Sequence, residues 1–211
     1  MRFDFFLDQL DAIKAIDVSA DDAHDAILPV MAKERKVAFE RDKNPKLSAV
    51  AATVFPKQDE AHLVLIERQS YNGVHSAQIG FPGGKVEEVD SDLEATALRE
   101  MEEELGIERS SPNYVRSLSH VYIPPSRFLV QPYVYYLEAA PSYVPDEREV
   151  SSVIEMPLAH LLDDQNVVNG KIKMSNGIVI STPYFAFEDY KIWGATAMML
   201  SEMKRILEQI K

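Results

Sequence analysis

Apolar residues recur along this chain with two different periods, which separate expected helices from expected strands. Helical spacing runs through residues 3–17, 21–40, 92–105 and from 194 to the C-terminus. Runs rich in Val, Leu and Ile, typical of β-strands, fall at residues 47–55, 62–68, 114–123, 128–138, 150–156 and 178–187. Strands and helices mixed in this order predict an α/β fold, with a mixed β-sheet covered by helices in an α/β/α sandwich.

The pair Asn44 and Pro45 interrupts the helical pattern near the start of the chain, before the first strand-like run. The length of 211 residues suits one compact domain with a terminal elaboration. We therefore expect an N-terminal helical extension at residues 1–44, followed by one domain at residues 45–211 that includes the C-terminal helix.

Composition narrows the possible partners. A net charge of −12 argues against a general nucleic-acid binder, because such proteins need clustered Lys and Arg to neutralise phosphates. The lack of cysteine excludes disulfides, thiolate metal sites and cysteine nucleophiles. No apolar run is long enough to cross a membrane, and the acidic start of the chain, with Asp4 and Asp8, is not a targeting peptide. We expect a cytoplasmic monomer or homodimer.

Three glutamates on the helix expected at residues 92–105 are the strongest candidates for chemistry. Glu100, Glu103 and Glu104 are spaced i, i+3 and i+4, so their carboxylates project from one helical face. Like charges at this spacing repel, and acids near the C-terminal end of a helix oppose its dipole. A hard cation such as Mg²⁺, which prefers oxygen ligands, would turn this arrangement into a binding site.

The surroundings of this helix favour a metal site over the alternative of a solvated, glutamate-rich surface. A Pro-Gly-Gly loop at residues 82–84 lies just upstream, and Gly106 is placed to end the helix. The two loop glycines are expected to allow a tight turn and a close backbone approach. Arg99, next to Glu100, is placed to orient a carboxylate.

Residues 99–107, REMEEELGI, match the second half of the Nudix box, R-E-U-x-E-E-x-G-U with U apolar, at every specified position. The first half, counted from Gly84, is one residue longer than the general pattern, with Asp90 where its early Glu would fall. A box of this length, and the segment HSAQIGFPGG at residues 75–84, resemble the coenzyme A pyrophosphatase branch of that family. Four further segments are similar to that branch: YIPPS at 122–126, EV at 149–150, MPL at 156–158 and IWGATA at 192–197.

The resemblance implies a Nudix-type fold and attack by water on a diphosphate, with Mg²⁺ or Mn²⁺ held by Glu100, Glu103 and Glu104. One carboxylate would take the proton, and both Glu100 and Glu149 remain candidates. The branch implies coenzyme A or acyl-CoA as substrate, split into 3′-phosphoadenosine 5′-phosphate and (acyl-)4′-phosphopantetheine. Two alternatives stay open. One is a Nudix hydrolase acting on ADP-ribose, dinucleotides or nucleoside triphosphates; the other is a non-catalytic nucleotide-sensing module.

Candidate substrate-binding residues surround the same loop and helix: Arg68, His75, Gln78, Gly83, Gly84, Lys85 and Arg127. An arginine at a strand end can pair with a phosphate, although many such residues are surface residues. His75 lies in the loop that resembles the coenzyme A branch, where it either contacts substrate or fixes the loop. The histidines show no zinc-binding spacing, and Val86 after Lys85 breaks the pattern of a phosphate-binding P-loop.

Overall fold

The computed structural model describes residues 1–28, 32–69, 78–173 and 177–210. Within these residues, an eight-stranded sheet forms the centre of the molecule. Its strands are β1 (Lys46–Lys57), β2 (Glu60–Arg68), β3 (Ile79–Gly80), β4 (Gly83–Lys85), β5 (Asn113–Ser117), β6 (Val121–Ile123), β7 (Phe128–Tyr136) and β8 (Val150–Pro157). The sheet is mixed, because β1 and β7 pair in parallel whereas β1 and β2 pair antiparallel.

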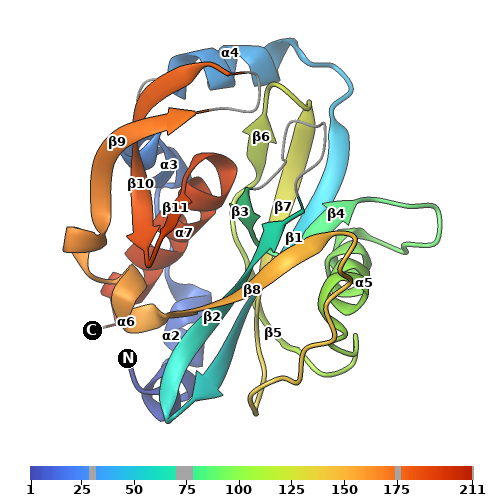
Figure 1. Cartoon of the computed structure of the whole chain (residues 1–211), viewed down its shortest axis with the longest axis vertical. Helices are drawn as coiled ribbons and strands as arrows, with labels where there is room; N and C mark the ends of the chain where they lie inside the picture. The colour runs from blue at the N-terminus through green and yellow to red at the C-terminus, as the bar shows by residue number, and fades with distance from the viewer. Residues whose placement is uncertain (29–31, 70–77, 174–176, 211) are drawn as a thin grey trace.

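A smaller sheet of three strands lies beside the C-terminal helix in the described part of the chain (Figure 1). It is formed by β9 (Val167–Lys173), β10 (Val179–Phe187) and β11 (Tyr190–Ile192). The helices are α1 (Phe3–Asp8), α2 (Leu10–Ala15), α3 (Ala20–Ile27), α4 (Ala32–Arg41), α5 (Leu93–Leu105), α6 (Leu158–Leu161) and α7 (Gly194–Glu208), with a 3₁₀ turn at Asp164–Asn166. None of the helices described is both long and apolar enough to cross a membrane.

Alternation along the central strands produces two separate cores, one on each face of the sheet. Ala49, Ala51 and Phe55 of β1 pack on one face in a cluster with Met101 of α5. Their neighbours on β1, such as Val54, face the other way and join a cluster that includes residues of α7 and of the N-terminal helices. Side chains in a strand point alternately to opposite faces, so the apolar residues of β1 lie on both faces of the sheet. Helices cover both: α5 covers one face, and α7 with the N-terminal helices covers the other. This arrangement confirms the predicted α/β/α sandwich with a mixed sheet (Figure 1).

The N-terminal helices pack into the core on the α7 face. Phe6 and Ile13 are buried in the same cluster as α7. The His24 imidazole of α3 lies 3.0 Å from the Glu202 carboxylate of α7, and both side chains are buried. The described N-terminal helices therefore contribute to the interior of the molecule, while the predicted boundary between residues 44 and 45 stays a prediction.

Several predicted elements are divided in the structure. The stretch at residues 3–17 forms α1 and α2, which are separated at Gln9, and residues 21–40 contain α3 and α4. The strand β9, VVNGKIK, was not predicted from the sequence. Most of its side chains are half-buried or exposed, so it lacks the apolar density used to recognise strands. Pairing with β10 determines its conformation instead.

Candidate metal and substrate site

Local signals at both ends place α5, the helix that carries the glutamates. At its start, the Asp92 side chain accepts a hydrogen bond of 2.8 Å from the Ala95 amide. At its end, Gly106 adopts a left-handed conformation with φ of 71°, and its amide donates to the Glu102 carbonyl. These caps confirm the predicted helix and its glycine stop. Met101 and Leu105 bury the opposite side of α5 against the sheet and hold its orientation.

Arg99 is the centre of an ion-pair network at the base of the site. Its side chain is 4% exposed, and Nε and Nη2 donate to the two oxygens of Asp90 at 2.8 and 3.0 Å. Nη1 lies 2.9 Å from Glu100 Oε1 and 2.9 Å from Glu103 Oε2. These hydrogen bonds to Arg99 hold the pKa of Asp90 well below its usual range. Arg99 thus contacts two of the three predicted metal-binding carboxylates.

Asp90 is a site residue to which the sequence analysis assigned no role. Its two oxygens hold the fork of the Arg99 guanidinium, a bidentate pairing that fixes orientation as well as charge. The signal that could have identified it was its position, where the early Glu of the Nudix box falls.

Glu104 is the most deeply buried of the three glutamates, with a side chain that is 1% exposed. Its oxygens accept hydrogen bonds from Arg68 Nη1 at 2.6 Å and from the Gly83 amide at 2.8 Å. Burial raises the pKa of Glu104 to about 7, although Arg68 opposes that change. Arg68 also donates through Nη2 to the Gly83 carbonyl at 2.6 Å, so it joins the glycine loop to α5.

The two loop glycines allow backbone and carboxylate to approach closely. A Cβ atom at Gly84 would lie 2.3 Å from Glu100 Oε1, and one at Gly83 would lie 2.3 Å from the Ala49 carbonyl oxygen. Gly83 also has a φ of 153°, which favours glycine. The expected close approach is therefore confirmed. Glu100 is held against this loop, where burial raises its pKa and the charge of Glu103 adds to the effect.

The carboxylates fit a divalent cation in chemical kind. Glu100, Glu103 and Glu104 surround Arg99 and the glycine loop and offer hard oxygen donors, which Mg²⁺ and Mn²⁺ prefer. Burial and like charge raise the pKa of Glu100, so a cation there would stabilise its charged form. Among the described residues, no three acidic or histidine side chains already converge on one point. Instead, Glu103 pairs with Arg99 and Glu104 with Arg68.

Glu149, the second candidate for the base, is exposed and directly precedes β8. Its carbonyl accepts a hydrogen bond of 2.8 Å from the Gln69 amide, and the next residue, Val150, pairs with Arg68. Strand pairing therefore places the Glu149 backbone beside the strand end that carries Arg68. This brings it to the part of the site that contains Glu104.

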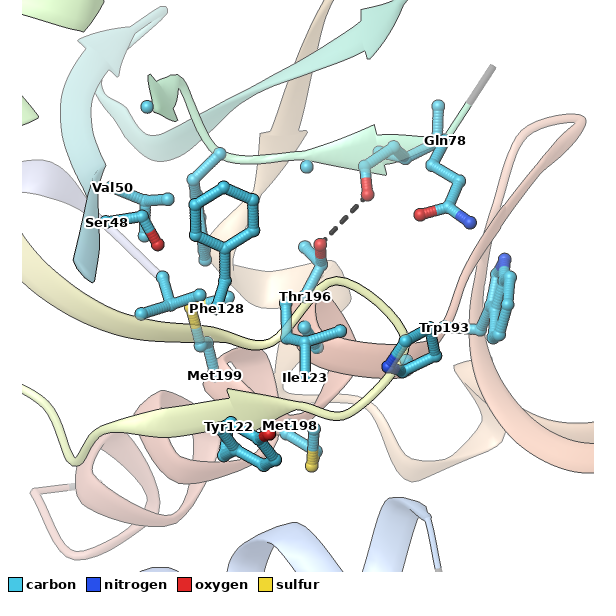
Figure 2. A pocket seen from close by; sticks show the side chains of 18 of the residues that line it. Ser48, Val50, Gln78, Tyr122, Ile123, Phe128, Trp193, Thr196, Met198 and Met199 are labelled. Atoms are coloured by element: carbon cyan, nitrogen blue, oxygen red, sulfur yellow. Dashed lines mark hydrogen bonds between the residues drawn. The ribbon is translucent and has the colours of Figure 1, made fainter. Parts of the chain in front are cut away.

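A cavity of about 420 Å³ begins at the glycine loop and continues between the central sheet and α7. Figure 2 shows Ser48 and Val50 on one side of it, with Gln78 and Trp193 on another. Thr196 Oγ1 donates to the Ile79 carbonyl at 2.9 Å and so ties α7 to β3 across the cavity. Most of the surface that lines this cavity is apolar.

Five of the seven predicted substrate-binding residues line this cavity: Arg68, Gln78, Gly83, Gly84 and Lys85. Arg127 lies elsewhere, with Nη2 donating to Asp42 Oδ1 at 2.6 Å and to the Asn44 carbonyl at 3.0 Å. Arg127 thus ties the turn before β7 to the segment that precedes β1. His75 lies outside the described residues.

The walls of the cavity come from segments that had been noted only as resemblances. Tyr122 to Pro125 form one side, and Trp193 to Thr196 form part of another. Met198 and Met199 of α7 are buried, as expected of core residues, but they also line the cavity.

Comparison with known proteins agrees with this geometry. The sequence profile described as the NUDIX domain matches residues 45–175, so the chain belongs to the Nudix family. Among solved structures, the MutT/nudix family protein from Enterococcus faecalis superposes with a TM-score of 0.54 at 14% identity, covering 92% of this chain and 76% of that one. At this identity the match supports the fold alone.

Two relatives are more similar in sequence. Nudix hydrolase 15, mitochondrial, of Arabidopsis thaliana is 34% identical over 164 residues, which are 74% of this chain and 56% of that protein. Mitochondrial coenzyme A diphosphatase NUDT8 of Homo sapiens is 32% identical over 140 residues, 66% of this chain and 59% of that protein. This chain spans between 56% and 65% of the length of four curated relatives. Since three of these four relatives are named as mitochondrial and one as chloroplastic, the cytoplasmic address stays a prediction.

Proposed function

We propose that this chain is a divalent-metal-dependent Nudix hydrolase that cleaves the diphosphate linkage of coenzyme A or an acyl-CoA. The products are 3′-phosphoadenosine 5′-phosphate and (acyl-)4′-phosphopantetheine. One observation carries the proposal. The carboxylate helix and an apolar cavity of about 420 Å³ meet at Gly83, Gly84 and Lys85. A diphosphate attached to a long, weakly polar arm matches this junction of charged and apolar surface.

Within this proposal, Glu100, Glu103 and Glu104 hold Mg²⁺ or Mn²⁺. When bound, such an ion neutralises negative charge on the diphosphate and makes coordinated water more acidic. Arg99 keeps Glu100 and Glu103 oriented through contacts of 2.9 Å each. The Gly83 amide and Arg68 hold Glu104 in place from the other side.

A proton acceptor for the attacking water is needed, and two carboxylates are suited to the role. Glu100 lies against the glycine loop, and burial raises its pKa, which makes it a stronger base than an exposed carboxylate. Glu149 is exposed and lies next in sequence to the residue that pairs with Arg68. Replacing each with Gln and comparing pH–rate profiles distinguishes them, because removal of the base abolishes the acidic limb of the profile.

The substrate assignment has two further supports. The cavity is lined by Tyr122 to Pro125 and by Trp193 to Thr196, the segments similar to the coenzyme A pyrophosphatase branch. The human relative named above is a coenzyme A diphosphatase at 32% identity. ADP-ribose, dinucleotides and nucleoside triphosphates remain the alternative substrates for the same carboxylate helix.

A substrate panel tests this proposal with the full chain. We expect coenzyme A or an acyl-CoA to have a higher kcat/KM than dephospho-CoA, ADP-ribose and NADH, with Mg²⁺ or Mn²⁺ and with products identified by mass. If ADP-ribose or NADH is preferred by about tenfold or more, equivalent to about 1.4 kcal/mol, the coenzyme A assignment is wrong and the hydrolase assignment survives. Binding of these nucleotides without turnover of any would identify a sensing module instead.

A further inference from the structure

Two buried polar side-chain atoms on the wall of the cavity have no hydrogen-bond partner among the described residues. They are Nε of Arg35 and Oγ of Ser48, on residues that are 8% and 5% exposed. A buried donor without a partner costs free energy, so native structures satisfy nearly all such groups. Two of them on one cavity indicate that a ligand, and not the protein, supplies their partner.

Arg35 comes from α4, in the N-terminal extension and outside residues 45–175, which match the NUDIX domain. Its Nη2 donates to Asp25 Oδ1 at 3.2 Å. Asp25 also accepts a hydrogen bond of 2.9 Å from Lys36 Nζ, so this carboxylate is shared between two cations. Asp25 thus holds one end of the guanidinium in position while Nε remains unpaired.

Ser48 is on β1, where it pairs with Lys85 of the glycine loop in the sheet. Figure 2 shows its hydroxyl beside Val50 and Phe128, on the cavity side of the strand. A serine hydroxyl can donate to an anionic oxygen, and a guanidinium recognises phosphate and carboxylate through several donors. The cavity therefore has polar groups of its own, in addition to those of the carboxylate helix.

Arg68 and Arg127, the two arginines predicted to contact substrate, are engaged by protein groups. Arg68 also lines the cavity, but it donates to Glu104 at 2.6 Å and to the Gly83 carbonyl at 2.6 Å. Arg127 donates to Asp42 and lies outside the lining. Of the two arginines that line the cavity in the described residues, Arg35 is the one with a buried donor that has no partner.

We propose that Arg35, assisted by Ser48, binds an anionic group of the substrate that is separate from the diphosphate being cleaved. The group is a phosphate monoester or a carboxylate, because a guanidinium and a hydroxyl each donate hydrogen bonds to anionic oxygens. This inference rests on the proposed function and deepens it, since it makes the N-terminal extension a determinant of substrate choice.

Two pairs of substrates test it and identify the source of the anion. Coenzyme A and dephospho-CoA differ by the 3′-phosphate, whereas succinyl-CoA and butyryl-CoA differ by a terminal carboxylate. In one of the two pairs, we expect wild type to prefer the member with the additional anionic group, coenzyme A or succinyl-CoA. The preference should be about ten- to a hundredfold in kcat/KM, the range of a charge-assisted contact. Arg35→Met should reduce this preference to about threefold or less, mainly by lowering kcat/KM for the member that carries the additional anionic group.

Lys36→Met is the matched control, because it removes a neighbouring charge and a contact to Asp25 but does not line the cavity. It should keep the wild-type preference, and Ser48→Ala should change it less than Arg35→Met. Thermal melting checks the fold of each variant, and Arg35→Gln replaces Arg35→Met if the latter unfolds. An unchanged preference in both pairs, or an equal loss on all four substrates, would overturn the inference.

Failure of the proposed function gives a different result. Wild type would then cleave the four coenzyme A compounds not at all, or about tenfold or more less efficiently than ADP-ribose or NADH. In that case calorimetric binding of inorganic phosphate, without divalent metal, tests Arg35 by itself. Weaker phosphate binding by Arg35→Met than by Lys36→Met supports the anion site, and equal binding by the two variants contradicts it.

Discussion

The two faces of the central sheet have different kinds of interior. On the α5 face, buried charges are neutralised by oppositely charged side chains: Arg99 by Asp90, and Glu104 by Arg68. On the α7 face, the cavity is walled largely by apolar side chains such as Phe128 and Met199. The first region holds charges in paired, fixed orientations, whereas the second offers shape and apolar area.

This difference separates the expected roles of the two regions. Paired charges act at close range and depend on geometry, so changes on the α5 face should affect every substrate alike. Apolar walls discriminate substrates by size and contact, so changes on the α7 face should affect some substrates more than others.

Removal of divalent metal should abolish turnover of every substrate, because the clustered carboxylates of α5 need a cation to act on a diphosphate. Activity in EDTA should be undetectable and should return with Mg²⁺ or Mn²⁺. Ion binding should also raise the melting temperature, since a ligand that binds only the folded state stabilises it. Undiminished turnover after thorough chelation would rule out the proposed role of α5.

Asp90→Ala should lower the free energy of unfolding by about 3–5 kcal/mol, because it leaves the buried Arg99 guanidinium without its main partner. Chemical denaturation measures this change. Asp146→Ala is the control. It removes an ion pair with Arg148, whose side chain is 87% exposed, and should have little effect on stability. A similar loss in both variants would contradict the importance assigned to burial.

Acidification should weaken the ion pair between Asp90 and Arg99. The pKa of Asp90 is lowered in the folded state, so its contribution is complete above the unfolded value, near 3.9, and is lost as the pH falls below it. Wild type should therefore lose stability on acidification below about pH 4. Asp90→Ala should lose less over the same interval, as measured by denaturation at each pH. An identical pH dependence in the two proteins would show that the ion pair of Asp90 and Arg99 is not the source of the acid-induced loss of stability.

Glu103→Gln should lower kcat by about a hundredfold or more on every substrate, the scale of losing a charge-stabilising group in an active site. Glu102→Gln is a closely matched control. Glu103 and Glu102 are adjacent, with side chains 55% and 39% exposed, and each pairs with one arginine. Glu102 bonds to Arg109 instead of Arg99 and should retain activity near wild type. Equal losses at both positions would contradict the assignment of helix faces.

Ile123→Phe should act on the other face of the sheet and have the smallest effect. The larger side chain would occupy part of the cavity and reduce kcat/KM for a long acyl-CoA by about tenfold, with little change for ADP-ribose. Leu47→Phe makes the same kind of change at an exposed position outside the cavity and should leave both values unaltered. Equal losses on both substrates after Ile123→Phe would show that the cavity does not select the acyl arm.

The sequence by itself was sufficient for features that depend on near neighbours in the chain. The bounds of α5 followed from Asp92 and Gly106, because capping groups act within one turn of a helix end. The shared face of Glu100 and Glu104 followed from helical spacing alone. The two-sided burial of β1 and β2 was equally readable from their dense apolar runs.

Only the tertiary structure decided the partners of these residues. Arg68 reaches Glu104 from 36 positions away, because β2 and the glycine loop lie beside α5. Arg127, a plausible phosphate contact in the sequence, is instead held by Asp42. The cavity joins residues as far apart as Arg35 and Trp193. Such contacts depend on which surfaces meet after the strands have paired. The periodicity of apolar residues along the chain does not encode contacts between residues so far apart in the sequence.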